Sequence, residues 1–246
     1  MRLAGKTALV TGGASGFGAG IVRKFVSEGA RVMVADLNGN GASALAEALD
    51  QVACTVDVSD GPSVEAMAQA AQEMFGDLDI LVNNAGITHQ KGPMEEVTEA
   101  EFDRVFAVNA KSVYLTARAF VPGMKARGSG AILNIASTAG VSPRPHLNWY
   151  NASKGWMITA TKAMAVELAP LGVRVNALNP VAGETPLLAS FMGEDTPEMR
   201  AKFLATIPLG RFSQPEDLGN AAAFLCSDEA SMLTGVCMEV DGGRCI

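Results

Sequence analysis

The sequence predicts an α/β protein built on a parallel β-sheet. Short apolar runs rich in β-branched residues alternate with longer segments of helical periodicity along the chain, and a glycine-rich turn joins the first such pair. Strands that helices cover on both faces are typically continuous apolar runs, as these are. The 246 residues are also within the size range of one α/β domain.

This alternation assigns the elements in order. The strands are expected at 6–10, 31–35, 52–56, 79–82, 130–136, 173–178 and 236–240. The helices are expected at 17–28, 40–49, 62–75, 100–127, 151–169 and 215–226. Right-handed crossovers between parallel strands place helices on both faces, so we expect a single doubly wound domain over 1–246 with seven strands.

One irregular region, 181–214, is rich in glycine and proline but still contains an apolar-periodic piece around Phe203. It predicts a helical flap over about 184–212 on the same domain. In open α/β sheets the ligand binds beyond the carboxyl ends of the strands. A flap after the sixth strand would cover that edge as a lid.

Composition excludes several classes of partner and site. The net charge is −7 and there is no basic run, so we expect neither nucleic acid nor membrane as a partner. The four cysteines form no C-x-x-C pair, so we expect no metal site and a reducing, cytoplasmic location. We also find no signal peptide and no apolar run of about 18 residues.

The turn Thr11–Gly18 follows the first expected strand and precedes the first expected helix. This layout brings a pyrophosphate to a helix N-terminus, where free N–H groups and the positive end of the dipole meet negative phosphates. The spacing G-x-x-x-G-x-G differs from the common G-x-G-x-x-G fingerprint, so an ordinary strand–helix turn remains the alternative.

Asp36 ends the second expected strand, 18 residues after Gly18. A carboxylate there accepts hydrogen bonds from an adenosine ribose and repels a 2′-phosphate. Leu37 and Ser15 offer no cation for such a phosphate, so the sequence favours NAD over NADP. The alternative is that Asp36 only caps the next turn.

Two other strand ends carry polar groups. Asp57 follows the third strand and could accept from the adenine amino group, or could be a turn aspartate before Ser59. Asn83-Asn84-Ala85-Gly86 closes the fourth strand, and its small residues permit close approach of a ligand. On its own, that segment also fits an ordinary turn.

Tyr150 and Lys154 are four residues apart at the start of an expected helix, so they share a face. An ammonium near a phenol lowers a pKa that begins near 10, which would let the phenol exchange a proton with an alcohol near neutral pH. Ser137 ends the fifth strand and would project to the same edge. An exposed helix pair and a turn serine are the alternatives.

The chain resembles the short-chain dehydrogenase/reductase family in a set of motifs that occur in the family's order. These are the turn at 11–18, the Asn83–Gly86 segment, Asn109, Ser137 and the run Tyr150–Lys154. The tail Asp241-Gly242-Gly243 is similar to that family's common ending, and the likeness covers essentially the whole chain. The resemblance implies a Rossmann fold, usually a homotetramer assembled as a dimer of dimers. It also implies reversible hydride transfer between a nicotinamide and an alcohol or carbonyl compound.

By the same resemblance, Tyr150 is the general base in oxidation and the general acid in reduction. Lys154 lowers the pKa of Tyr150 and bonds the nicotinamide ribose, while Ser137 holds the substrate oxygen. Asn109 positions a water that links Lys154 to solvent.

The resemblance further implies a set of residues that contact NAD, in three parts of the chain. They are Gly12, Ser15, Gly16, Phe17 and Gly18 in the turn, Asp36, Asp57, Val58, Asn83, Ala85 and Gly86 after the next strands, and Pro180, Gly183 and Thr185 after the sixth. Three positions depart from the family pattern: Phe17 replaces a common Ile or Leu, Val181 replaces the Gly that often follows Pro180, and Gly183 replaces a common Val or Ile. The carboxamide contact is therefore expected at Thr185 more than at Gly183.

Substrate residues are expected on the loops around this edge. The candidates are Thr88, His89, Ala139, Arg144, His146, Trp149, Leu187, Leu188, Phe191 and Met192. Arg144 and His89 could meet an anionic group or lie on plain surface. The segments 183–186 and 191–197 resemble a branch of the family that includes oxidisers of aryl-methanols bearing sulfonate.

The expected helices 100–127 and 151–169 are apolar over much of their circumference, which predicts burial on more than one side. In the family the matching helices form a dimer interface; a thicker monomer core is the alternative. We therefore expect an NAD-dependent dehydrogenase of alcohols. One alternative is an NADPH-dependent 3-oxoacyl-type reductase, and Asp36 argues against it. The other is a catalytically silent NAD-binding regulator, and the presence of Tyr150 argues against that.

Overall fold

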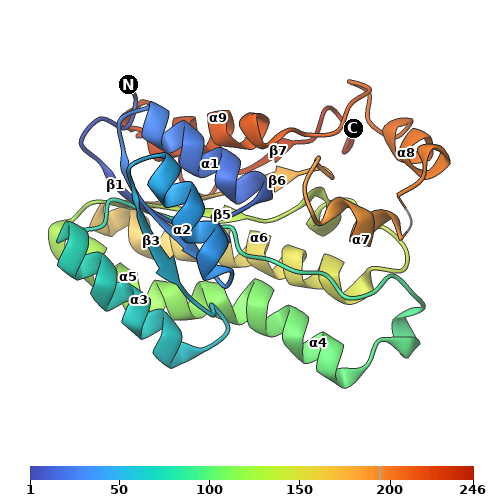
Figure 1. Ribbon diagram of the computed structural model, residues 1–246, viewed down its shortest axis with the longest axis horizontal. Coiled ribbons are helices and arrows are strands. Elements are labelled where there is room, and N and C mark those ends of the chain that lie inside the picture. The colour runs from blue at the N-terminus through green and yellow to red at the C-terminus, as the bar shows by residue number, and fades with distance from the viewer. Residues whose placement is uncertain (194) are drawn as a thin grey trace.

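The computed structural model describes residues 1–193 and 195–246. Within these residues, seven parallel strands form one sheet in the order β3-β2-β1-β4-β5-β6-β7 (Figure 1). The strands are β1 (Thr7–Thr11), β2 (Arg31–Asp36), β3 (Val52–Thr55), β4 (Ile80–Asn83), β5 (Gly130–Ile135), β6 (Val173–Pro180) and β7 (Cys237–Val240). The predicted Rossmann arrangement is confirmed.

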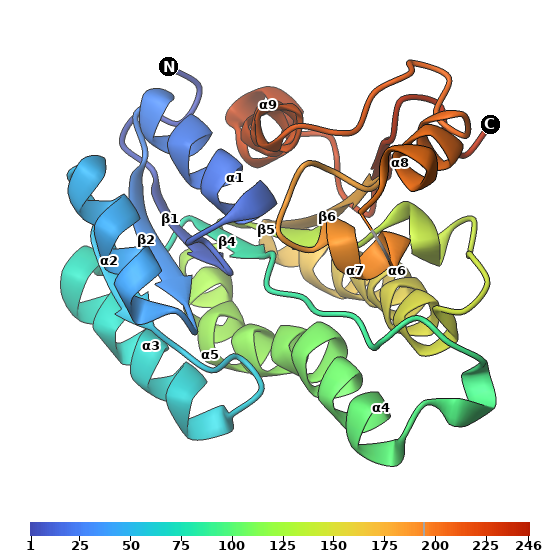
Figure 2. The same cartoon turned by 45° about the vertical axis from the view of Figure 1, so that its right-hand side comes forward.

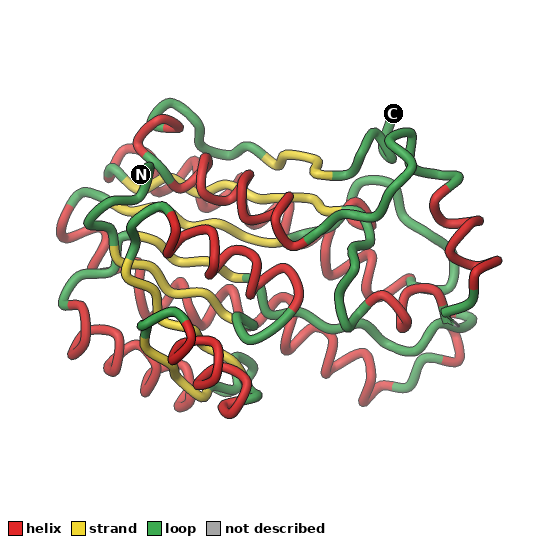
Figure 3. The backbone as a smooth tube through the Cα atoms, turned by 45° about the horizontal axis from the view of Figure 1, so that its top comes forward, coloured by secondary structure: helices red, strands yellow, loops and turns green. Residues whose placement is uncertain are grey.

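Helices cover both faces of the sheet (Figures 1 and 3). One layer contains α1 (Gly16–Ser27), α2 (Gly39–Ala48) and α9 (Pro215–Cys226), and the other contains α3 (Gly61–Phe75), α5 (Ser112–Arg127) and α6 (Asn148–Leu168). In β1, Ala8 and Val10 pack into the core under the first layer, and Leu9 packs into the core under the second. This two-residue alternation is what buries a strand on both faces.

The strand order reverses between β1 and β4, which pair with Ala8 opposite Ile80 and Val10 opposite Val82. The chain builds outward from β1 to β3 and then returns to start β4 on the other side of β1. At such a switch point the loops beyond the strands diverge, and a crevice opens at the carboxyl edge.

The prediction of a single helix over 100–127 is wrong in detail. The chain forms α4 (Glu99–Phe106), a π-helical stretch (Ala107–Lys111) and then α5. The π-helical stretch contains Asn109, whose side chain is fully buried and bonded to both backbone groups of Ile87. An extra residue in one helical turn leaves the apolar periodicity nearly unchanged, so the sequence pattern did not reveal it.

The segment between β6 and α9 contains α7 (Leu188–Met192) and α8 (Pro197–Leu204). It has a small apolar core of its own, made by Val181, Leu188, Met192, Ile207 and Phe212. In Figure 2 α7 lies in front of α6, with α8 above it. Four short 3-10 turns complete the described elements: Met94–Glu96, Thr138–Gly140, Ala169–Leu171 and Asp228–Ala230. Among the described residues, no helix is both long and apolar enough to cross a membrane.

Candidate active site

A cavity of about 440 Å³ opens at the carboxyl ends of the central strands, with the segment after β6 along one side. Most of the predicted site residues line it: Gly12, Ser15, Gly16, Phe17, Gly18, Asp36, Asp57, Val58, Ala85, Gly86, Ser137, Tyr150, Lys154, Pro180, Gly183 and Thr185. Of the predicted catalytic and cofactor residues, Asn83 and Asn109 are not among the lining. The fold thus brings together groups that lie up to 173 residues apart in the chain, from Gly12 to Thr185.

The glycine turn is a close-packed cradle. Gly12 and Gly16 have φ of +61° and +52°, which other residues rarely adopt. A Cβ on Gly18 would overlap the carbonyl oxygen of Gly12, and a Cβ on Gly12 would lie 2.9 Å from the Cα of Ala85. Asn84 locks the turn, because its Nδ2 donates to the carbonyl oxygens of Thr11 and Gly12 at 2.9 Å.

The N-terminus of α1 faces this cradle without a side-chain cap. Ser15 stands at the N-cap position but makes no capping hydrogen bond, and the first turn of α1 contains no acidic residue. The helix dipole and free N–H groups are therefore available to an anion, as a pyrophosphate requires.

Asp36 lies at the end of β2, where its carboxylate is fixed by two backbone N–H groups. Oδ2 accepts from Ala14 at 3.0 Å and Oδ1 from Asn38 at 2.9 Å. Leu37 beside it is 71 % exposed and carries no charge for a 2′-phosphate. Together with the cradle, this carboxylate fits NAD, whose adenosine ribose has a free 2′-hydroxyl.

The structure supports both interpretations of Asp57. Its Oδ1 accepts from the backbone N–H of Ser59 at 2.9 Å and from the Ser59 hydroxyl at 2.6 Å. These two bonds hold the pKa of the Asp57 carboxyl below its usual range. Asp57 therefore shapes its turn and also lines the cavity.

Asn83 is the predicted cofactor residue that the structure places elsewhere. Its side chain is buried in the sheet, where it donates to Asn134 and accepts from the Thr116 hydroxyl at 2.9 and 2.8 Å. Successive side chains of a strand point to opposite faces, so Asn84 rather than Asn83 reaches the glycine turn. The Asn84 side chain was not among the predicted cofactor residues, although the alternation of side chains along β4 could have singled it out.

Tyr150 and Lys154 lie on the first turns of α6, and both are only 4 % exposed. Burial raises the pKa of Tyr150 to about 12, and a hydrogen bond with Ser137 opposes this rise. Burial lowers the pKa of Lys154 to about 8. Tyrosine and serine are thus adjacent at the cavity wall, with an amine behind them.

The predicted effect of Lys154 on Tyr150 is not present in this arrangement. The Lys154 Nζ donates to the carbonyl oxygen of Ile135 at 2.8 Å and lies 6.0 Å from the centre of the Tyr150 ring. Because the ammonium is directed to that carbonyl, desolvation dominates the pKa of the phenol.

Asn109 is fully buried and does not line the cavity. Its Oδ1 accepts from the N–H of Ile87, and its Nδ2 donates to the Ile87 carbonyl and to the Ser153 hydroxyl, at 2.9 to 3.0 Å. Ser153 precedes Lys154 on α6. Asn109 therefore joins the loop after β4 to the helix that carries Tyr150.

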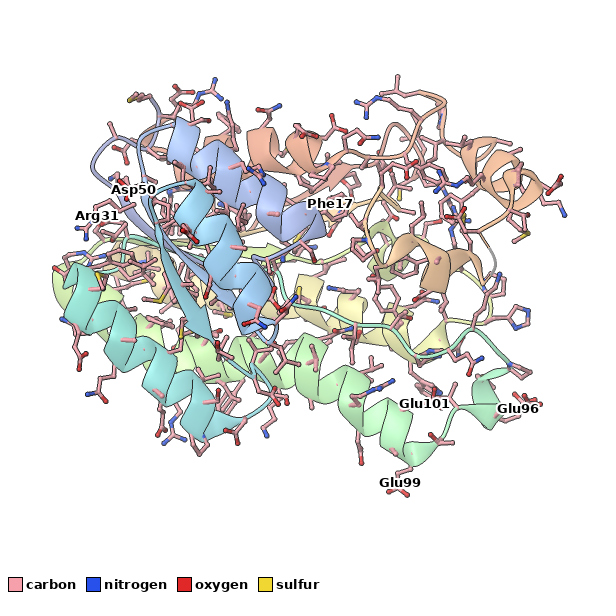
Figure 4. All side chains as sticks on the ribbon, in the orientation of Figure 1. Phe17, Arg31, Asp50, Glu96, Glu99 and Glu101 are labelled. Carbon is pink, nitrogen blue, oxygen red and sulfur yellow. The ribbon has the colours of Figure 1, made fainter. Side chains whose placement is uncertain are left out.

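Two of the departures from the family pattern, Phe17 and Gly183, are neighbours in space. A Cβ on Gly183 would overlap the ring of Phe17 and lie 2.8 Å from the carbonyl oxygen of Ser213. Figure 4 shows Phe17 at the N-terminal end of α1, toward the middle of the molecule, whereas Arg31 lies at its left-hand edge. The larger ring at position 17 therefore requires the missing side chain at position 183.

The predicted substrate residues divide into two groups. Ala139, Arg144, Leu187 and Phe191 line the cavity. The others are engaged elsewhere: Thr88 and His89 bond within their own loop, Leu188 and Met192 fill the core of the flap segment, Trp149 donates to Met94, and His146 is exposed. The rings of Phe191 and Tyr150 meet edge to face, 5.1 Å apart. Asn151 and Phe203 also line the cavity and were not predicted.

Comparison with known proteins agrees with this site. A family model described as enoyl-(acyl carrier protein) reductase matches residues 12–244. The chain is 52 % identical over 253 residues to 4-formylbenzenesulfonate dehydrogenase of Comamonas testosteroni, covering 99 % of both chains. It is 38 % identical over 243 residues to cis-4-hydroxycyclohexanecarboxylate dehydrogenase of Sinomonas cyclohexanicum, covering 97 % of this chain and 96 % of that one.

A solved structure also matches the chain over nearly its whole length. The crystal structure of 3-ketoacyl-(acyl-carrier-protein) reductase from Brucella melitensis complexed with NADH superposes with a TM-score of 0.94 at 49 % identity, covering 99 % of this chain and 100 % of that one. The chain therefore belongs to the short-chain dehydrogenase/reductase family and is an oxidoreductase that transfers a hydride between NAD(H) and an alcohol or carbonyl substrate.

Proposed function

We propose that this protein oxidises aryl alcohols to the corresponding aldehydes with NAD. One observation carries the proposal: Phe191 stands edge to face against Tyr150, so an aromatic surface borders the phenol itself. Leu187 and Phe203 extend that apolar wall. The relative at 52 % identity acts, by its name, on an aryl aldehyde, which supports the same class of substrate.

In this proposal Ser137 donates a hydrogen bond to the substrate oxygen, and Tyr150 takes the hydroxyl proton as the alcohol is oxidised. The bound nicotinamide supplies the hydride acceptor. Lys154, which lines the cavity and donates to the carbonyl oxygen of Ile135, would bond the nicotinamide ribose. Asn109 acts as a positioning residue through Ile87 and Ser153.

The cofactor residues divide along the cavity. The backbone of the glycine turn (Gly12, Ser15, Gly16, Phe17 and Gly18) would hold the diphosphate, and Asp36, Asp57 and Val58 the adenosine. Ala85 and Gly86 would lie along the middle of the cofactor, and Pro180, Gly183 and Thr185 beside the nicotinamide. The cradle in which added Cβ atoms would clash supports this assignment.

The direct test is turnover with NAD of benzyl alcohol against cyclohexanol and a linear secondary alcohol. We expect kcat/KM for benzyl alcohol to exceed the others by about tenfold, because one ring packed against apolar walls is worth one to a few kcal/mol. Phe191→Leu should reduce this preference while leaving turnover of the linear alcohol unchanged. Equal efficiency for all three alcohols in the wild type would contradict the proposal.

A second candidate is reduction of 3-ketoacyl thioesters, which the printed function of the structure at 49 % identity favours. The acidic net charge of −7 offers no evident basic surface for an acidic carrier protein. Faster turnover of a 3-ketoacyl thioester with NADH than of any aryl aldehyde would make this candidate the better one.

We further propose a single domain over 1–246 in which the segment 184–212 is a flap over the substrate. We also propose a homotetramer built as a dimer of dimers, supported by the exposed apolar side chains of Tyr114 on α5 and of Trp156 and Val166 on α6. A cytoplasmic location is supported by the free thiols of Cys54, Cys226, Cys237 and Cys245.

A further inference from the structure

Two arginines near the substrate end of the cavity, Arg144 in its lining and Arg244 outside it, have no acidic partner among the described residues. Arg144 lines the cavity half-buried, with its guanidinium 3.9 Å from the centre of the Phe203 ring and one N–H donated to the Thr206 hydroxyl at 3.0 Å. In residues 1–193 and 195–246, no carboxylate lies within 4 Å of Arg144 or of Arg244. A guanidinium withdrawn from water without a counterion is unfavourable.

Arg244, from the C-terminal tail, adds a second positive charge at the same place. Its side chain donates to the Ser142 hydroxyl at 3.3 Å, and its Nε is buried without a hydrogen-bond partner among the described residues. Burial and the neighbouring charge of Arg244 together lower the pKa of Arg144 to about 10, so Arg144 stays charged at neutral pH. The protein thus holds two like charges together, a pairing that a bound anion would relieve.

This lack of a carboxylate is local, because the chain has 26 acidic residues against 19 basic ones. Arg200, on α8 of the same segment, pairs with both Glu184 and Asp195. Arg211, just beyond α8, pairs with Asp217. The paired arginines of this segment do not line the cavity, whereas the unpaired Arg144 does.

The position of Arg144 is coupled to the reacting phenol. The Asn151 Nδ2 donates to the backbone carbonyl of Arg144 at 2.7 Å, and Asn151 directly follows Tyr150 on α6. Asn151 is itself 7 % exposed and lines the cavity, and its Oδ1 has no partner among the described residues. The backbone of Arg144 is therefore tied to the helix that carries Tyr150, and the Phe191 ring packs edge to face against that phenol.

We propose that Arg144, reinforced by Arg244, is an anion-binding subsite that selects alcohols whose ring carries a carboxylate or sulfonate away from the reacting carbon. This rests on the proposed function for the ring and the alcohol, and it adds the charged substituent. Guanidinium binds such oxyanions through directed N–H donors, and the aromatic face of Phe203 holds its plane in place. Neutral aryl alcohols would bind at the same centre but without this contact.

The first experiment compares a matched pair of substrates, para-(hydroxymethyl)benzoate and para-(hydroxymethyl)benzamide, with saturating NAD. Wild type should favour the benzoate by about tenfold to a hundredfold in kcat/KM, mainly through KM, as expected for one charge-assisted contact. Arg144→Gln should abolish that preference, because it should lower kcat/KM for the benzoate far more than kcat/KM for the benzamide. Arg144→Lys should recover part of it, and Arg244→Gln should reduce it less than Arg144→Gln.

Arg104→Gln is the control for net charge, because Arg104 is exposed on α4 and lies outside the cavity lining. It should leave the preference for benzoate unchanged. Equal kcat/KM for benzoate and benzamide in wild type, or an undiminished preference in Arg144→Gln, would overturn the subsite while leaving aryl alcohol oxidation intact.

A binding measurement separates the subsite from the proposed reaction. Benzenesulfonate and its neutral counterpart benzenesulfonamide are titrated by calorimetry into protein saturated with NADH. Wild type should bind benzenesulfonate about tenfold more tightly than benzenesulfonamide. Arg144→Gln should bind the two ligands with equal affinity. If wild type prefers benzenesulfonate but oxidises no aryl alcohol, the subsite is supported and the proposed function is rejected. If wild type binds the two ligands with equal affinity, the subsite is rejected.

Discussion

Lys154 is a buried amine whose one hydrogen bond is to the carbonyl of Ile135. Its ordinary pKa of 10.5 is lowered to about 8 by burial, so below pH 8 the folded protein must keep a charge that water would solvate better. Such a group lowers the stability of the protein without its cofactor. Active-site groups with strongly shifted pKa values are commonly retained in spite of this, because the chemistry needs them.

The pH dependence of stability follows from this shift. Between about pH 8 and 10.5 the folded Lys154 is neutral while the unfolded one is still protonated, so the unfolded state binds more protons and stability rises with pH. We therefore expect the Tm deficit of wild type relative to Lys154→Met to shrink between pH 7 and pH 10. Tyr150, whose pKa is raised to about 12, has the opposite effect only above pH 10.

Thermal unfolding followed by circular dichroism checks this prediction, with Lys162→Met as the control on the same helix. Lys162 is exposed, so its variant should keep a constant Tm difference from wild type across this range. A Tm difference between wild type and Lys154→Met that stays constant with pH would mean that Lys154 is not desolvated.

At the scale of elements, α1 and the segment after β6 fit through Phe17 and Gly183. We expect Gly183→Val to clash with the Phe17 ring and weaken NADH binding by about tenfold or more, since overpacking typically disturbs a site by 1–3 kcal/mol. Phe17→Leu alone should have a small effect. The double variant should bind NADH better than Gly183→Val, and nicotinamide fluorescence measures all three; additive losses would show that the two positions are independent.

At the scale of the whole molecule, the outer surfaces of α5 and α6 are the candidate subunit interface. Val166 is 80 % exposed on α6 and Tyr114 55 % exposed on α5, so both helices present apolar surface that a second subunit could cover. If the protein is the proposed tetramer, Val166→Glu should convert it to smaller species in light scattering coupled to gel filtration, because a buried charge at an interface is unfavourable. Met74→Glu on α3 serves as the control, and a wild-type mass of one chain would refute the tetramer.

The sequence predicted the elements well where burial on both faces leaves a continuous apolar run, and each strand lies within two residues of its expected range. It was less informative at Asn83 and Asn84, where the direction of each side chain depends on alternation along a strand whose last residue the apolar run does not mark. The contact of Phe17 with Gly183 and the approach of Arg244 to Arg144 join distant parts of the chain, so only the folded structure brings them together.

Reduction of NAD by the Tyr150→Phe variant tests the central claim most directly, and the chain supplies its own control because Tyr114 is its one other tyrosine. Tyr150→Phe should bind NADH as wild type does, yet oxidise benzyl alcohol at least about a hundredfold more slowly, because it cannot accept the hydroxyl proton. Tyr114→Phe should match wild type in both respects. Full activity in Tyr150→Phe would contradict the account of this site.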